Sequence, residues 1–221
     1  MNTTDIRQLH IRQLQKLYRT KKKEIVRRLK EFDSRMKEED DAAVFSELVF
    51  CLLTPQSKAK CCWDAVETLN RKKILVAGNE DEIKVNLRGV RFHNKKAAYI
   101  VKARKLFKKS GAAPLKTSLG QFSDVHECRD WLVKNIKGLG YKEASHFLRN
   151  IGSGDGIAIL DRHILRNLVF FGVIEDIPSS LSRETYSGIE KKMAGFARSI
   201  RIPLAHLDLL LWYKETGEIF K

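Results

Sequence analysis

Cysteine is scarce in this 221-residue sequence, and its spacing excludes the common metal-binding patterns. The four cysteines are Cys51, Cys61, Cys62 and Cys128, with no CxxC pair and no histidine partners at metal spacing. This spacing predicts reduced, mostly buried thiols and no metal site. A chain of this length can bury a sizeable core, so we expect it to need neither disulfides nor a metal for stability.

Long apolar runs are missing as well. No segment is apolar enough over a sufficient length to cross a bilayer, and the first residues, MNTTDIRQLH, lack the apolar stretch of a signal peptide. We therefore expect a cytoplasmic protein without a membrane partner. Internal repeats and low-complexity segments are also absent.

Positive charge, in contrast, is abundant. Lysine and arginine total 42 against 27 aspartates and glutamates, which gives a formal net charge of +15. A surplus this large favours a polyanionic partner, with nucleic acid as the first hypothesis and association with the nucleoid as its consequence. Charge alone leaves open a solubilising surface or a membrane surface.

Apolar residues recur at helical spacing along most of the chain, which predicts an all-α fold. The clearest sets are Phe45, Leu48, Val49, Leu52 and Leu53; Ala59, Cys62, Trp63, Val66 and Leu69; and Ile100, Ala103 and Phe107. Strand-like runs are few and short, the best being KILVAG near residue 75 and GIAIL near residue 158. Neither run has an obvious pairing partner.

Two composition shifts suggest how the chain divides. The first forty or so residues predict one or two basic amphipathic helices, and EEDDAAV then marks a boundary where Asp41 is the expected helix cap. The glycine-rich GSGDG at 152–156 predicts a hinge. We therefore expect a central helical domain of residues 44–151 and a second helical domain made of residues 1–43 plus 152–221.

The segment NIKGLGYKEASHFLRNIG, residues 135–152, predicts a helix, a tight hairpin and a second helix. Gly138 and Gly140 suit backbone angles that other residues avoid and allow another backbone to approach closely. Together with Lys137, the turn amides and the positive start of the second helix predict a site for one DNA phosphate. An ordinary glycine-capped hairpin is the alternative.

Lys142 occupies the start of that second helix, where the helix dipole disfavours a cation. The position suits a nucleophilic amine, although a lysine there can also simply hold a phosphate. Nineteen residues later, Asp161 lies where an extended segment enters a new helix in AILDRHILRNL. Its ordinary role is an N-cap.

The pattern GLGYK, followed after this interval by LDRH with Arg166 behind it, resembles the helix-hairpin-helix superfamily of DNA glycosylases. Three further segments resemble the short archaeal-type 8-oxoguanine DNA glycosylase/lyases: CLLTPQSKAK at 51–60, GVRFHNKKAAYIVKAR at 89–104 and the terminal LDLLLWYKETGEIFK. The resemblance covers most of residues 44–221. Many relatives carry four clustered C-terminal cysteines for an iron-sulfur cluster, but no cysteine follows Cys128, so we expect no cluster and no other cofactor.

The resemblance implies two helical domains flanking a DNA-binding cleft, with Lys142 on one side and Asp161 on the other. It also implies a monomeric repair enzyme that acts on double-stranded DNA containing an oxidised base. In that role Lys142 attacks the sugar, expels 8-oxoguanine and forms an imine, and β-elimination then cuts the strand. Asp161 supplies the anion that the positively charged transition state requires.

Base extrusion requires a pocket and contacts to the opened duplex. By the resemblance, the pocket residues are Pro55, Gln56, Asp208, Trp212 and Lys221. Trp212 is expected to stack on the base, with a core position as the alternative, and the terminal Lys221 to recognise the oxidised base. The other expected DNA contacts are Arg91, Phe92, His93, Asn94 and His163.

Some of these roles have alternatives. Phe92 is either a wedge in the duplex or a core residue, and His163 either orients Asp161, binds a phosphate or is structural. For the whole chain, the alternatives are a helix-hairpin-helix glycosylase for another damaged base, either an oxidised pyrimidine or an alkylated purine, and a non-catalytic DNA-binding module.

Overall fold

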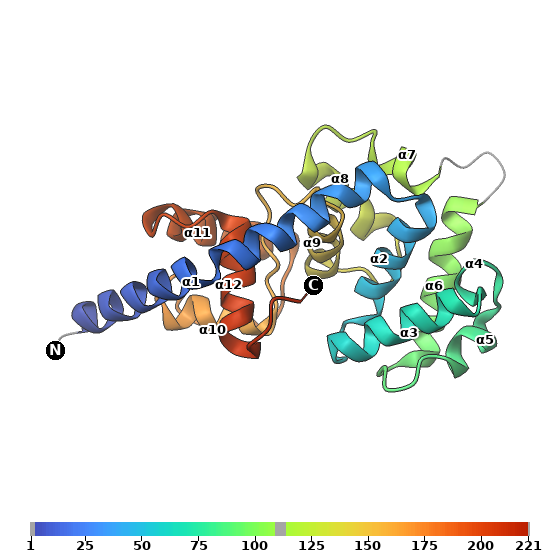
Figure 1. Cartoon of the computed structure of the whole chain (residues 1–221), viewed down its shortest axis with the longest axis horizontal. Coiled ribbons are helices and arrows are strands. Elements are labelled where there is room, and N and C mark those ends of the chain that lie inside the picture. The colour runs from blue at the N-terminus through green and yellow to red at the C-terminus, as the bar shows by residue number, and fades with distance from the viewer. Residues whose placement is uncertain (1–2, 109–113, 221) are drawn as a thin grey trace. The chain divides into compact units, whose positions relative to one another are not determined.

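The structure is a computed structural model that describes residues 3–108 and 114–220 (Figure 1). Within these residues the chain is helical and contains no strand, which confirms the prediction of an all-α fold. The helices are α1 (Thr3–Glu38), α2 (Asp41–Leu53), α3 (Ala59–Arg71), α4 (Ile74–Ala77), α5 (Glu80–Val85), α6 (His93–Lys108), α7 (Leu115–Leu119), α8 (Val125–Asn135), α9 (Tyr141–Asn150), α10 (Arg162–Phe170), α11 (Arg183–Ser199) and α12 (Leu204–Thr216).

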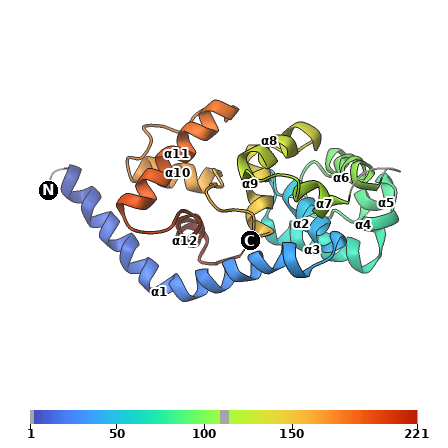
Figure 2. The ribbon, with the colours of Figure 1, turned by 90° about the horizontal axis from the view of Figure 1, so that it is seen from above.

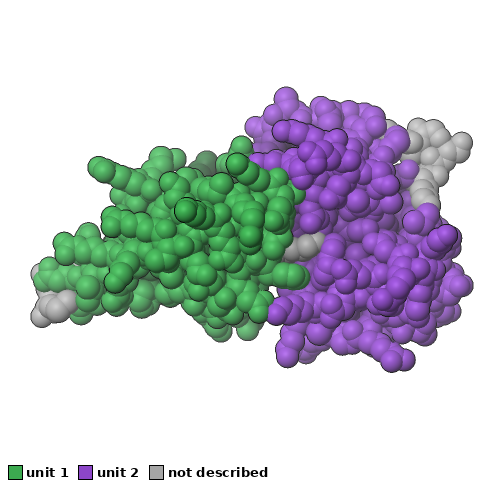
Figure 3. Space-filling view, in the orientation of Figure 1, with its two compact units in different colours: residues 1–32, 154–221 green, residues 33–153 purple. Residues whose placement is uncertain are grey.

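The chain divides into two compact units (Figure 3). Unit 1 comprises residues 1–32 and 154–221, and unit 2 comprises residues 33–153. One division therefore falls inside the continuous helix α1, and the other beside the glycine-rich segment at 152–156. The expected domain limits stay a prediction, because compactness alone does not establish independent folding.

Unit 2 is built around α2, which is buried on nearly all sides because its sequence is apolar around the whole helix. Its neighbours are α3, α6, α7 and α9, and α9 in turn packs against α8 (Figure 2). The side chains of Leu48, Phe50 and Leu52 are essentially inaccessible to solvent. The helix that precedes the predicted hairpin and the helix that follows it are therefore both anchored in one core.

The predicted cap of α2 is wrong by one residue. Asp40, in extended conformation, caps the helix by accepting a hydrogen bond from the Ala43 amide at 2.8 Å. Asp41 instead accepts a hydrogen bond from the Lys116 amide at the start of α7, also at 2.8 Å. Two adjacent aspartates are equivalent in a sequence pattern, and only the distant α7 distinguishes them.

Neither strand candidate pairs. The first, near residue 75, forms the short helix α4, while residues 157–160 are buried and irregular and form no ladder. Their backbone is satisfied by side chains of α11: the Ala158 amide donates to Glu190 at 2.8 Å, and the Leu160 amide donates to the Tyr186 hydroxyl at 3.1 Å. That hydroxyl donates in turn to the Ala158 carbonyl at 2.7 Å. Helix α11 thus supplies the hydrogen bonds that a second strand would give.

Unit 1 centres on α12, whose residues Leu207 to Leu211 are all buried and which packs against α10 and α11. Helix α1 covers this unit with its apolar face, where Leu14 and Ile25 are buried. The Tyr18 hydroxyl lies 2.8 Å from the Nδ1 atom of His206, which links α1 to α12. No helix in the described part of the chain is long and apolar enough to cross a membrane.

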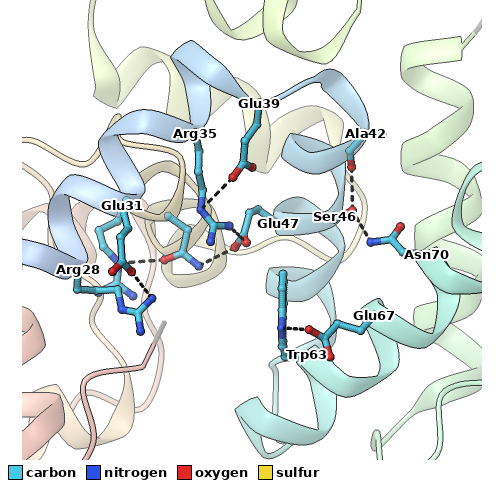
Figure 4. Close-up of polar contacts among 12 residues, drawn as sticks. Arg28, Glu31, Arg35, Glu39, Ala42, Ser46, Glu47, Trp63, Glu67 and Asn70 are labelled. Atoms are coloured by element: carbon cyan, nitrogen blue, oxygen red, sulfur yellow. Dashed lines mark hydrogen bonds and ion pairs between the residues drawn. The ribbon is translucent and has the colours of Figure 1, made fainter.

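A buried carboxylate ties α1, α2 and α9 together in unit 2 (Figure 4). Glu47 is fully buried, pairs with Arg35 and accepts a hydrogen bond from the Asn150 side chain at 3.1 Å. We expect Glu47→Ala to lower the free energy of unfolding by about 3 kcal/mol, because it removes the buried carboxylate that pairs with Arg35 and accepts the hydrogen bond from Asn150. Urea unfolding measures this, with Glu67→Ala on the exposed side of α3 as the control. Equal stability of the two variants would contradict a structural role for Glu47.

Candidate active site

The predicted helix-hairpin-helix is present, formed by α8, the turn at residues 136–140 and α9. Ile136 and Leu139 are buried and anchor the turn, while Lys137 and Gly138 are exposed. Gly140 is the N-cap of α9 and offers no side chain to cap its first amides. The start of α9 is thus the kind of helix end that accepts an anion, and the phosphate site stays a prediction.

The two hairpin glycines differ in their requirements. Gly138 has a φ of +93°, and a Cβ atom there would overlap the ring of Tyr99 from α6. Gly140 has a φ of −93° and a ψ of −179°, a conformation open to any residue. The expectation of special backbone angles therefore holds for Gly138 alone, and the close approach there involves an aromatic ring, not a backbone.

We expect Gly138→Ala to destabilise the fold by about 2 kcal/mol, through the left-handed backbone and the clash with Tyr99. Gly140→Ala should cost less, because its Cβ would meet only the carboxylate of Glu143, at 3.0 Å. Thermal unfolding of the two variants side by side tests this difference. A Gly140→Ala variant as unstable as Gly138→Ala would contradict it.

Lys142 lies in the first turn of α9, as the sequence predicted. Its side chain is 21% exposed, and its Nζ atom lies 3.8 Å from Oε1 of Glu143. Burial lowers the pKa of Lys96, and the charge of Lys142 adds to that lowering. Lys142 is thus a partly accessible amine beside a carboxylate.

Asp161 follows the buried segment 157–160 held by α11 and caps α10, accepting a hydrogen bond from the Ile164 amide at 2.8 Å. This confirms its expected capping position. The bond uses the Oδ1 atom, and Oδ2 accepts no hydrogen bond from any described residue. A half-buried carboxylate with one free oxygen is suited to stabilise a nearby positive charge.

Helices α10 and α12 are joined by Asn167, which is buried. Its amide donates to Glu215 at 2.9 Å and accepts from Lys214 at 2.9 Å. His163 packs edge-on against Trp212 with ring centroids 5.3 Å apart, and its Nδ1 atom lies 3.8 Å from Glu215. No hydrogen bond joins His163 to Asp161 in the described residues, so the expected orienting role finds no support.

Trp212 is half-buried on α12, which leaves part of its side chain accessible to a base. Asp208, one turn earlier, is buried. Lys221 lies outside the described residues. The pocket roles of Asp208, Trp212 and Lys221 stay predictions.

Two expected DNA contacts lie on backbone of unusual geometry. Gln56, exposed next to half-buried Pro55, has a φ of +55°, and Phe92 has a φ of +57°. Residues other than glycine, asparagine and aspartate rarely adopt this left-handed backbone conformation, and such backbone strain is concentrated at functional sites. Phe92 is 53% exposed, with the Arg91 guanidinium 5.7 Å from its ring centroid. The core alternative for Phe92 is therefore wrong, while the wedge stays a prediction.

The neighbouring contacts on this segment are also exposed. His93 and Asn94 begin α6 with their side chains accessible to solvent, as Arg91 is. All three can therefore reach a partner outside the chain, but their expected contacts to phosphates or to the opposite base stay predictions.

The thiols are free, and three of the four are buried, as expected. Burial raises the pKa of Cys62 and of Cys128 to about 11. In the described residues no group of three or more His, Cys, Asp or Glu side chains is placed to hold a metal ion.

The adjacent cysteines provide a test of this burial. We expect iodoacetamide at pH 8 to modify half-buried Cys61 before Cys62, because only the thiolate reacts and burial keeps Cys62 protonated. Peptide mass spectrometry of the native protein measures the two sites separately. Equal labelling of Cys61 and Cys62 would contradict the packing of α3.

Sequence reasoning missed Lys96, Ser57 and Tyr99 as supports of the site. Lys96 shares helical spacing with Ile100 and Ala103, both buried, so a lysine within an apolar stripe was the available signal. Tyr99 had no such signal, because its role depends on contact with Gly138, 39 residues away.

The helical fold of the described residues, with a hairpin lysine at the start of one helix and an aspartate capping another, matches what is expected of helix-hairpin-helix DNA glycosylases. Comparison with known proteins agrees. The model of the family described as 8-oxoguanine DNA glycosylase matches residues 25–202. The 8-oxoguanine DNA glycosylase/AP lyase of Fusobacterium nucleatum is 44% identical over 96% of this chain and 98% of its own length.

Solved structures agree as well. The crystal structure of the 8-oxoguanine DNA glycosylase of Methanocaldococcus jannaschii matches all of both chains with a TM-score of 0.88 at 35% identity. The same enzyme in complex with DNA containing 8-oxoguanine matches 96% of this chain and all of its own, with a TM-score of 0.87 at 36% identity. The chain belongs to the 8-oxoguanine DNA glycosylase family.

Proposed function

We propose that this protein is a bifunctional DNA repair enzyme, which excises 8-oxoguanine from double-stranded DNA and cuts the strand at the resulting abasic site. The observation that carries the proposal is the full-length match to a relative whose structure was determined with DNA containing 8-oxoguanine. The hairpin lysine, the capping aspartate and the net charge of +15 support it independently.

The reaction assigns one step to each key residue. The neutral amine of Lys142 attacks C1′ of the sugar, the bond from C1′ to the base breaks, and the base leaves with the bonding electrons. Asp161 stabilises the positive charge that develops on the sugar. Ring opening gives an imine to Lys142, and loss of a C2′ proton then expels the 3′ phosphate oxygen. Because Lys142 and Asp161 belong to different units, their approach to one sugar is part of the proposal.

The remaining roles follow the same scheme. Pro55, Gln56, Asp208, Trp212 and Lys221 are proposed to hold the extruded base, and Lys137, Gly138 and Gly140 a DNA phosphate. Arg91, Phe92, His93, Asn94 and His163 are proposed to contact the opened duplex. We expect a monomer that works without a cofactor.

An excision assay tests the function. Four duplexes of one sequence carry 8-oxoguanine, guanine, an oxidised pyrimidine or an alkylated purine at one position, and release of the base is followed together with strand cleavage. We expect cleavage of the 8-oxoguanine strand alone. Preferred release of another damaged base would overturn the substrate assignment, and binding without release would favour a non-catalytic DNA-binding module.

A further inference from the structure

A buried cation lies beside the proposed base pocket. Lys96 on α6 is only 4% exposed, and its Nζ atom donates to the Leu53 carbonyl at 2.7 Å, the Pro55 carbonyl at 2.7 Å and the Ser57 hydroxyl at 3.1 Å. These three bonds use all three ammonium protons. These bonds offset the free-energy cost of burying a charge, so the ammonium and its three acceptors depend on one another for their positions.

The three acceptors surround one residue of the turn after α2. Leu53, Pro55 and Ser57 lie on both sides of Gln56, whose backbone is in the left-handed region. The Ser57 hydroxyl also accepts a hydrogen bond from the Arg91 amide at 3.0 Å, next to Phe92, which is left-handed as well. One ammonium and one hydroxyl therefore fix both strained segments relative to each other.

We infer that Lys96 is a positioning residue, which holds the Pro55–Gln56 turn in the geometry that grips the extruded base. The inference rests on the proposed function and adds a prediction that separates its two reactions. Base excision needs Gln56 at the base edge, whereas cleavage at a ready-made abasic site has no base to hold. Loss of Lys96 should therefore impair the first reaction much more than the second.

The test compares Lys96→Met with Arg104→Met under single-turnover conditions, on a duplex with 8-oxoguanine and on one with an abasic site. Arg104 is a matched control, because it lies on the same helix and donates to the carbonyls of Ile74, Leu75 and Gly78, away from the turn. We expect Lys96→Met to slow excision by about 10- to 100-fold, which is the effect of a displacement near 1 Å. The fold-reduction in the rate of abasic-site cleavage should be smaller by a factor of at least about ten. Arg104→Met should leave the ratio of the two rates unchanged.

Parallel loss of both reactions in Lys96→Met, or loss of neither, would overturn the role of Lys96. If Lys96→Met fails to fold, Ser57→Ala replaces it in the test. This variant removes the hydrogen bond from Lys96 to Ser57 and the hydrogen bond from the Arg91 amide to Ser57. Ser57→Ala should slow excision less than Lys96→Met does, and it should again slow excision more than abasic-site cleavage. If the ratio of the two rates equals that of the wild-type protein, the inference is overturned. A wild-type protein that does not excise 8-oxoguanine would contradict the proposed function itself.

A second inference comes from the outer face of α1. Basic residues recur there at intervals of three or four and form one stripe, about 27 Å long at 1.5 Å per residue. Its members, all exposed, are Arg12, Lys16, Arg19, Lys23, Arg27 and Lys30. Of these six residues, Arg27 alone forms an ion pair with a described residue, to Glu31 at 3.9 Å. Four of the six precede residue 25, where the family match begins.

The opposite face of α1 is fixed to unit 1, so the stripe is a rigid surface. Besides the Tyr18 contact, the Gln15 side chain donates to the Ile200 carbonyl at 3.0 Å, and the Lys21 ammonium lies 4.3 Å from the ring centroid of Tyr213. A membrane-surface helix needs a free apolar face, but Leu14 and Ile25 of this helix are buried in the protein. The charge therefore fits a phosphate backbone better than a lipid surface.

We propose that this stripe binds the phosphates of duplex DNA. The test measures the affinity of the triple variant Lys16→Gln, Arg19→Gln and Lys23→Gln for an undamaged duplex across a series of salt concentrations. The control removes equal charge from exposed positions of α11, through Lys191→Gln, Lys192→Gln and Arg198→Gln.

Three lost phosphate contacts should reduce the slope of log affinity against log salt by about 2.7, with little change in the control. An unchanged slope, or an equal change in the control, would overturn the proposal. Stronger binding of wild-type protein to phosphatidylglycerol vesicles than to the duplex at the same salt would also overturn it.

Discussion

Lys142→Gln is expected to lower the rate of 8-oxoguanine excision and strand cleavage by at least about 10⁴-fold, because glutamine cannot form the imine on which both steps depend. Lys142 is only partly buried, and its Nζ atom lies 3.8 Å from the Glu143 carboxylate, so the folded state should tolerate the substitution. Affinity for the duplex should fall little, since phosphate contacts dominate binding. Single-turnover rates and anisotropy on one duplex give both values.

The matched control is Lys137→Gln, five residues earlier in the exposed turn. It removes the same charge from the same hairpin without removing the proposed nucleophile, so it should weaken binding slightly and preserve cleavage. If Lys137→Gln were as inactive as Lys142→Gln, the hairpin charge and not the imine would explain the effect. Substantial cleavage by Lys142→Gln would exclude Lys142 as the nucleophile.

Asp161→Asn has the second-largest expected effect, a loss of about 10²- to 10³-fold in excision. Asparagine is as good an N-cap as aspartate, so the bond to the Ile164 amide and the stability of α10 should survive. The variant therefore removes the charge and keeps the cap, which separates catalysis from folding. Excision rates and thermal unfolding, measured on the same sample, check the two parts.

Asp161→Ala completes this comparison. It removes cap and charge together, so it should be as slow as Asp161→Asn and less stable by about 1 kcal/mol. An Asp161→Asn variant with nearly full excision would show that the carboxylate acts only as a cap, and the account of the charged transition state would then be wrong.

Local patterns were enough to predict the elements that hold Lys142 and Asp161. The hairpin follows from two apolar stripes separated by a turn too short for another structure, and Asp161 follows from the start of a periodic segment. Both depend on residues within one or two helical turns, which is the range over which periodicity and capping act.

Contacts between residues far apart in the chain determine the features that local sequence patterns did not predict. The choice between Asp40 and Asp41 depends on α7, more than 70 residues away. The buried segment before Asp161 pairs with no strand, and Tyr186 and Glu190 of α11 accept hydrogen bonds from its amides instead. Lys96 likewise acts on a turn some 40 residues earlier in the chain. No local pattern encodes these partners.

Borohydride trapping identifies both the nucleophile and the damaged base in one measurement. The wild-type protein is incubated with borohydride and duplexes carrying 8-oxoguanine, guanine or an oxidised pyrimidine, and the adduct is digested and sequenced by mass spectrometry. We expect a covalent adduct on the 8-oxoguanine duplex alone, attached to Lys142 and lost in Lys142→Gln. An adduct on another lysine, or none on 8-oxoguanine under conditions of strand cleavage, would contradict this expectation.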